Sequence, residues 1–169
     1  DVCSSDLKIL DELFLETVKY FDGDVKRIQH FTKVHAYAAL IGRLEGLCSE
    51  KQFILETAAI VHDIGIKNAE KKYGNCNGKL QETEGPPVAK TLLRSLKIDE
   101  DTINRVCFLV GNHHTYKNID DLDFQILAEA DLIVNFCEEG TAVSGIKNAL
   151  ENIFKTKTGM ELCRSTFTI

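Results

Sequence analysis

The sequence lacks several features that would point to particular classes of protein. It contains no tryptophan, and its six cysteines are spaced singly without a C-x-x-C pair. A chain of 169 residues buries enough core without a disulfide framework, so we expect reduced and mostly packed thiols. The Walker A motif of phosphate-binding loops, the dinucleotide fingerprint G-x-G-x-x-G and the serine hydrolase motif G-x-S-x-G are all missing.

Long apolar runs and an excess of positive charge are missing as well. No segment approaches the roughly 18 consecutive apolar residues of a membrane span, and acids interrupt residues 1–20, where a signal peptide would be apolar. We therefore expect a cytoplasmic protein, although the chain begins at Asp1 and leaves the completeness of its N-terminus open. The net charge of −6 disfavours a nucleic-acid-binding surface. The lysine-rich residues 67–79 still leave room for a small anionic ligand.

Helical periodicity dominates the sequence. Apolar residues recur at intervals of three and four, and no sustained alternation indicates a strand. We predict an all-α fold in a single domain, residues 1–169, with helices at 5–21, 24–47, 50–63, 86–96, 100–113, 122–138 and 142–155. Pro86 and Pro87 fit only the first turn of the helix that they open. Residues 65–85 contain four glycines and are predicted to be irregular, and loops of this length are usually functional or mobile.

Two histidines fall on the apolar faces of predicted helices. His35 lies within the apolar stripe of the 24–47 helix, and His62 follows Leu55 by seven residues on the stripe of the next helix. We therefore expect both imidazoles to face the interior. Taken singly, an inward histidine is more often a hydrogen-bonded core residue than a metal ligand. His30 lies off the stripe, and we expect it on the surface.

Three more polar side chains, in or next to the predicted helices at 100–113 and 122–138, also lie on apolar faces. His113 and His114 follow Val110 by three and four residues, so both rings can reach one centre. Asp131 lies within an apolar face, where an ionised carboxylate must be paired with a donor or bound to a cation. With Asp63, four of the five histidines and two aspartates then gather in the interior. A bound cation explains this grouping better than packing does.

The neighbouring residues His62 and Asp63 end a buried helix. Successive helix positions differ by about 100°, so the two side chains can meet only where the helix ends at a cavity. There the imidazole can bind one ion, and the carboxylate has two oxygens that can bridge to a second. Two ions about 3.5–4 Å apart activate water and hold a phosphoryl group. The pair therefore predicts a dinuclear metal site.

This order of residues resembles the signature of the HD-domain superfamily of metal-dependent phosphohydrolases. That signature consists of a first His, an adjacent His-Asp pair and a late Asp. In this sequence these match His35, His62 with Asp63, and Asp131, and the resemblance covers about residues 25–138. It implies a compact multi-helix bundle with a central metal site.

Dinuclear members of this superfamily carry further ligands between the His-Asp pair and the last Asp. The paired histidines of GNHHTY match such an element, and Glu84 in TEGPPVAK takes the place where many relatives have another His. The resemblance therefore implies one ion bound by His35, His62, Asp63 and Asp131, and another bound by Asp63, Glu84, His113 and His114. Glu84 has an equally good interpretation as a first-turn carboxylate that the helix dipole favours.

Departures from the pattern narrow the subfamily. The segment HHTYKNID lacks the GYP element of the cyclic-dinucleotide phosphodiesterases, and IGIKNAE replaces the Glu-Asp of guanosine tetraphosphate hydrolases. Small stand-alone bacterial HD proteins, among them dinuclear-iron hydrolases of diadenosine polyphosphates, are more similar, and the substrate stays open. Two other classes stay open too: HD-like di-iron oxygenases, which hydrolysis without O₂ would exclude, and non-catalytic nucleotide sensors.

The resemblance implies that Asp63 is catalytic, by helping to hold metal ions that activate a hydroxide for attack on a phosphoester or phosphoanhydride bond. Lys67, four residues later, is predicted to contact a phosphate oxygen, whereas Lys71, Lys72 and Lys79 either guide an anion or form a solvated surface. Nitrogen and oxygen ligands without thiolate suit Fe or Mn first, and Co, Ni, Zn or Mg otherwise. The expected partner is a small phosphorylated molecule, most simply a nucleotide.

Overall fold

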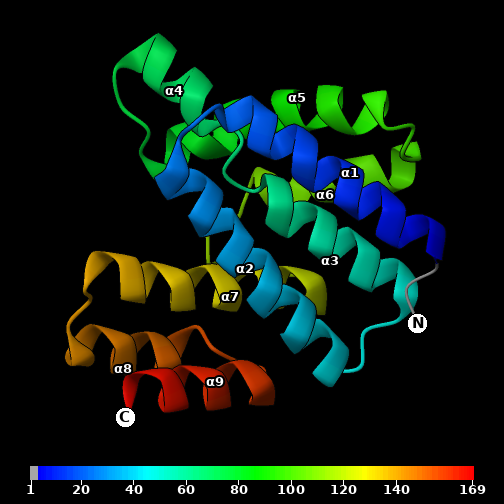
Figure 1. The fold of residues 1–169 in the computed structure, drawn as a ribbon. Coiled ribbons are helices and arrows are strands. Elements are labelled where there is room, and N and C mark those ends of the chain that lie inside the picture. The colour runs from blue at the N-terminus through cyan, green and yellow to red at the C-terminus, as the bar shows by residue number, and fades with distance from the viewer. Residues whose placement is uncertain (1–3) are drawn as a thin grey trace.

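The computed structural model describes residues 4–169, and within this range the chain forms nine helices and no strand. The predicted all-α class is confirmed. The helices are α1 Ser4–Phe21, α2 Val25–Leu44, α3 Ser49–Val61, α4 Ile66–Tyr73, α5 Gly78–Ser95, α6 Glu100–Val110, α7 Leu122–Glu139, α8 Val143–Asn152 and α9 Lys157–Phe167. Figure 1 shows α2 crossing in front of α7, with α4 and α5 on one side of them and α8 and α9 on the other.

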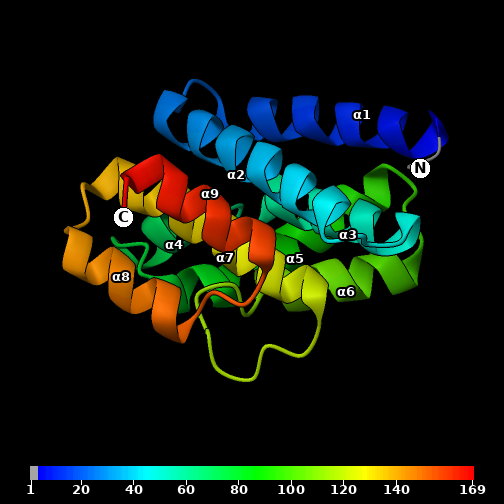
Figure 2. The same ribbon diagram turned by 90° about the horizontal axis from the view of Figure 1, so that it is seen from below.

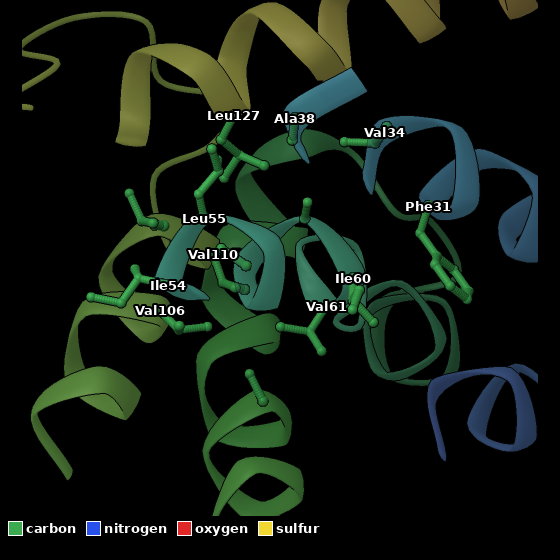
Figure 3. Close-up of a cluster of buried hydrophobic side chains, with 14 of the residues drawn as sticks. Phe31, Val34, Ala38, Ile54, Leu55, Ile60, Val61, Val106, Val110 and Leu127 are labelled. Atoms are coloured by element: carbon green, nitrogen blue, oxygen red, sulfur yellow. The ribbon is translucent and has the colours of Figure 1, made fainter. Parts of the chain in front are cut away.

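Helix α3 forms the centre of the main core. Its residues from Gln52 to Val61 are all buried, because α1, α2, α6 and α7 pack around it. A helix covered on every side is apolar all round rather than along one stripe. Figure 3 shows side chains from four helices meeting in this core, among them Val34, Leu55, Val110 and Leu127. The residues that follow α3 therefore emerge inside the protein.

Helix α7 separates the main core from a second apolar cluster. The second cluster is formed by Leu132, Ile133, Phe136, Ile146, Leu150, Phe154 and Cys163. It joins α7 to α8 and α9, which lie beside α7 in Figure 2. The buried carboxylate of Glu129 also accepts hydrogen bonds from the backbone amides of Lys155 at 2.6 Å and Thr156 at 2.9 Å. Helix α7 is therefore held on both sides, which fixes the position of Asp131.

The prediction for residues 65–85 is wrong, because this segment contains α4 and the beginning of α5. Asn77 caps α5 through its side chain, well before the prolines. Pro86 and Pro87 therefore lie inside α5 and not in its first turn, and each removes one backbone hydrogen bond from the helix. Helix α9 lies beyond the last predicted helix and is a second omission of the prediction.

Two glycines let α5 cross closely over the end of α3. A side chain on Gly65 would meet the backbone nitrogen of Gly85 at 2.5 Å and the carbonyl oxygen of Gln81 at 2.7 Å. Only glycine permits such an approach of two backbones. These glycines are packing residues rather than signs of a loop, and the contact places α5 against the turn that carries His62 and Asp63.

The structure of residues 4–169 can be compared with two expectations from the sequence, one about membrane spans and one about the cysteines. No helix in this range combines the length and the apolar character of a membrane span. The five cysteines in the range are free thiols. Cys163 is buried, but Cys48 and Cys137 are exposed, so the expectation of mostly packed thiols is only partly right. Cys3 lies outside the described residues.

Candidate metal centre

Histidine and aspartate side chains from distant parts of the sequence meet at one place in the interior. His62 and Asp63 follow the last turn of α3, and Asp131 lies in α7. Nε2 of His30, in α2, lies 3.2 Å from Nε2 of His62 and 3.1 Å from Oδ1 of Asp131. Nε2 of His113, just after α6, lies 3.4 Å from Oδ1 of Asp63. We call this group the His/Asp cluster.

The structure corrects which histidine of α2 joins the cluster. We expected His35 to face inward and His30 to lie on the surface. His30 is buried instead, and His35 faces the core helix α3 but lies outside the cluster. His30 is 7% exposed, whereas His35 is partly exposed and its Nε2 lies 3.0 Å from Oε2 of Glu56. Five helix positions amount to a rotation of about 140°, so the two rings leave α2 on different sides. His30 faces α7, and His35 faces α3.

The outer nitrogens of two cluster histidines fix their tautomers. Nδ1 of His62 lies 2.8 Å from the carbonyl oxygen of Ala59, and Nδ1 of His113 lies 2.8 Å from that of Val110. Because a carbonyl oxygen only accepts, each Nδ1 carries the proton and each neutral ring presents an Nε2 lone pair to the cluster. Histidines that bind metals usually have their other ring nitrogen bonded in this way.

Glu138 gives His30 the same kind of support, a role that was not predicted from the sequence. Its Oε2 lies 2.9 Å from Nδ1 of His30, and its Oε1 accepts a hydrogen bond from Lys33 at 2.8 Å. A carboxylate at Nδ1 orients the ring and increases the basicity of Nε2. Glu138 follows Asp131 by seven residues, which is about two helical turns. This spacing of two acids on one helix is the feature of the sequence that could have indicated Glu138.

Three buried atoms of the cluster have no hydrogen-bond partner among the described residues: Oδ1 of Asp63, Oδ2 of Asp131 and Nε2 of His113. Buried polar atoms are nearly always bonded, and each unpaired one costs about 1–3 kcal/mol. In its neutral form, which binding of a cation requires, His113 is an acceptor at Nε2 like the two carboxylate oxygens, so none of the three atoms can then satisfy another. Bound cations can satisfy such acceptors, and the residues therefore fit a metal site.

The cluster contains two groups of candidate ligands that share Asp63. In each group the ligand atoms lie within 4.8 Å of one another; the first is His30, His62 and Asp63, and the second is Asp63, His113 and His114. The ring of His114 fits here because position 78 is a glycine, where a Cβ atom would come within 2.9 Å of the ring. Nε2 of His114 also lies 3.0 Å from Oε1 of Gln81. Asp63 would be available to a cation in either group, because its carboxylate has two oxygens.

Comparison with known proteins agrees with this geometry. Residues 27–135 match the family model described as the HD domain. The chain belongs to the HD domain family. The match begins before His30, ends after Asp131, and agrees with the extent of the resemblance seen in the sequence. No curated protein matches the sequence.

A solved structure shares the fold of this HD domain. It is the crystal structure of a predicted HD superfamily hydrolase from an uncultured Thermotogales bacterium, with a TM-score of 0.63 and 23% sequence identity. The similarity covers 95% of this chain and 84% of that one. At this identity the comparison establishes the fold, and the chemistry must be argued from the site itself.

Two residues with predicted roles have other partners in this HD domain. Glu84 accepts hydrogen bonds from the ammonium group of Lys72 at 2.6 Å and from the hydroxyl of Tyr73 at 3.1 Å. Lys67 donates to the backbone carbonyl of Tyr20 at 2.7 Å and lies over its ring. Glu84 is in neither group of candidate ligands, so the metal ligand predicted at Glu84 and the phosphate contact predicted at Lys67 find no support in these contacts and stay predictions. The reason is that α4, which the sequence did not reveal, brings these groups to partners outside the cluster.

Glu82 positions the loop that carries the paired histidines. Its side chain is buried, and Oε1 accepts hydrogen bonds from the backbone amide of His114 at 3.2 Å and from the hydroxyl of Thr115 at 2.8 Å. These contacts tie the loop after α6 to α5. This role of Glu82 was not predicted, since Glu82 lies in the segment that was expected to be irregular.

The charges of the cluster stabilise one another in the absence of a cation. Burial raises the pKa of Asp63 and Asp131, but neighbouring histidines, among them His62 and His113, outweigh burial, so both pKa values lie below the usual range. Burial lowers the pKa of His30, but the hydrogen bond with Asp131 and the nearby carboxylate charges outweigh it and raise this pKa to about 9. His30 therefore holds a proton at neutral pH when no metal is bound.

We expect metal binding at pH 7 to release a proton. With a pKa of about 9, His30 must lose its proton before Nε2 can bind a cation. Burial lowers the pKa of His113, but the interaction with the Asp63 carboxylate outweighs burial and raises this pKa as well, so the apparent metal affinity should rise at least about tenfold per pH unit up to pH 9. Titration calorimetry in two buffers with different heats of ionisation gives the number of protons released. The variant His35→Gln should release as many protons as the wild type, and binding without proton release would contradict a ligand role for His30.

A cavity of about 400 Å³ opens beside the His/Asp cluster. Its lining includes His30, Asp63, His114 and Asp131 on the cluster side, and Tyr116, Asn135, Glu139 and Thr141 beyond it. This volume suits a small ligand. Cavities of about 480 and 470 Å³ elsewhere on the surface contain no cluster residue, so chemistry rather than volume identifies the site.

Proposed function

We propose that this HD domain is a metal-dependent phosphohydrolase that cleaves a phosphoester or phosphoanhydride bond of a small, nucleotide-like molecule. The observation that carries the proposal is the set of three unpaired acceptors on Asp63, Asp131 and His113, at the point where several helices bring imidazoles and carboxylates together. The adjoining cavity of about 400 Å³ provides room for a substrate. Membership of the HD domain family supports the same conclusion.

Two metal ions fit the ligand groups best in this proposal. The first would be held by His30, His62, Asp63 and Asp131, and the second by Asp63, His113 and His114. Divalent ions at such positions supply a hydroxide nucleophile at neutral pH and stabilise the charge on phosphoryl oxygens. The nitrogen and oxygen ligands suit Fe or Mn first.

The remaining residues of the site would prepare the ligands and orient the substrate. Burial and the charge on His113 lower the pKa of His114 to about 4, so His114 can bind a cation without losing a proton. Burial raises the pKa of Tyr116, which keeps its hydroxyl protonated as a hydrogen-bond donor in the cavity lining. Glu82 and Glu138 hold the loop after α6 and the ring of His30 in place. We place this activity in the cytoplasm as part of the proposal.

Phosphate release from a panel of compounds tests the proposal. The panel contains nucleoside mono-, di- and triphosphates, dinucleoside polyphosphates and cyclic nucleotides, with protein loaded with Mn²⁺ or Fe²⁺ and assayed in air and without oxygen. We expect turnover of one group of compounds that does not depend on O₂. A strict requirement for O₂ would indicate an oxygenase, and nucleotide binding without turnover by metal-loaded protein would indicate a sensor; either result overturns the proposal.

A further inference from the structure

The lining of the cavity beside the His/Asp cluster has unusually little positive charge for a site that binds phosphorylated molecules. Among the described residues, no lysine or arginine lines it. Beyond the cluster, its lining offers the neutral polar side chains of Tyr116, Asn135 and Thr141 and the carboxylate of Glu139. A chain of several phosphates would therefore meet no lysine or arginine side chain here.

The lysines near the site are engaged elsewhere. Lys67 bonds the carbonyl of Tyr20, and Lys72 bonds Glu84. Lys33 bonds Glu138 on the far side of His30. None of them is part of the cavity lining. The lysines that the sequence suggested as guides for an anion do not supply positive charge inside the cavity.

Three residues of α7 form a row that leads from the cluster to the mouth of the cavity. Asp131, Asn135 and Glu139 follow one another at intervals of four residues, and all three line the cavity. Residues at this interval lie on one face of a helix. Glu139 lies eight residues after Asp131, or about 12 Å along the helix axis. This separation places Glu139 beside the part of a substrate that does not react.

The charges of the site favour a substrate with a single phosphate group. Asp63, Asp131 and Glu139 bring three carboxylates to the cavity lining. Two divalent cations and one hydroxide would together offset these three negative charges, so the phosphate of a phosphomonoester would be held at the cations themselves. Each additional phosphate adds negative charge, which the carboxylate of Glu139 repels and no lysine or arginine side chain of the lining compensates.

We propose that Glu139 is a specificity-determining residue, which makes the site selective for phosphomonoesters with one phosphate and a neutral, hydrogen-bonding organic group. Asn135, Tyr116 and Thr141 bind that neutral group, and Glu139 disfavours substrates with longer phosphate chains. The inference rests on the proposed hydrolase function, because it assumes that the metal ions hold the reacting phosphate.

Charge reversal at Glu139 tests the inference. The measurements are kcat/KM and equilibrium binding for the monophosphate and triphosphate of one nucleoside, with saturating Mn²⁺. For the wild type we expect the monophosphate to be preferred at least about tenfold, and Glu139→Lys should reduce this preference by at least about tenfold. The matched control is Glu151→Lys, an exposed position on α8 outside the cavity, which should leave the preference unchanged.

The outcomes separate this inference from the proposed function. Absence of turnover for every compound would contradict the hydrolase, but the binding preference and its response to Glu139→Lys would still decide the inference. A wild-type protein that binds or hydrolyses the triphosphate as well as the monophosphate would overturn it. Equal preferences in the Glu139→Lys and Glu151→Lys variants would also overturn it.

Discussion

Replacement of Asp63 by alanine is expected to reduce the proposed phosphohydrolase activity by at least about a thousand-fold. The reason is that Asp63 belongs to both groups of candidate ligands, so its loss removes a ligand from each ion. Removal of Asp63 also deprives the buried His113 of the carboxylate oxygen that lies 3.4 Å from its Nε2. Both metal content and turnover should fall together.

The measurement is kcat/KM on the best substrate of the panel, together with the number of metal ions per chain by elemental analysis. Asp11→Ala, at an exposed position of α1, is a matched control that should retain both. Circular dichroism shows whether the Asp63→Ala protein is folded. A folded variant that keeps two metal ions and wild-type turnover would remove Asp63 from the metal centre.

Much of the helical framework could be predicted, because periodicity reports helices that have one apolar face. Helix α6 was predicted at 100–113 and is observed at Glu100–Val110, and α7 was predicted at 122–138 and is observed at Leu122–Glu139. Asp99 caps α6 by accepting a hydrogen bond from the amide of Thr102. In these elements local capping and long-range packing favour the same ends.

The segment from α4 to α5 could not be predicted, because the tertiary structure overrides the usual preference of its glycines and prolines for loops. Glycines and prolines normally mark loops. Here Gly65 and Gly85 allow two backbones to touch, and Pro86 and Pro87 lie inside a helix that has begun at Gly78. A reader of the sequence alone does not know that another helix crosses at this point.

The grouping within the candidate site was predicted where a helix ends in the core. His62, Asp63 and His113 lie at such ends and come together with Asp131 as expected. The choice of His35 over His30 failed, because α2 is covered by α3 on one side and α7 on the other. A single apolar stripe does not describe a helix that is buried on two flanks.

The contrast between His30 and His35 gives the second large expected effect. His30→Gln should lower metal occupancy and reduce turnover at least about 100-fold, because an amide replaces an imidazole beside His62 and Asp131. His35→Gln makes the same chemical change five residues away on α2 and should leave both unchanged, since an amide can still donate to Glu56.

Metal content by elemental analysis and kcat/KM on the same substrate give the comparison, and thermal melting of both variants separates loss of metal from loss of the fold. The pair is informative because each substitution controls for the other in helix propensity and side-chain size. Loss of metal and turnover in His35→Gln, with both retained in His30→Gln, would show that the centre forms on the other side of α2. Metal content and turnover retained in both variants would mean that neither imidazole of α2 binds the metal, which would leave the unpaired oxygen of Asp131 without the neighbouring ligand that the structure assigns to it.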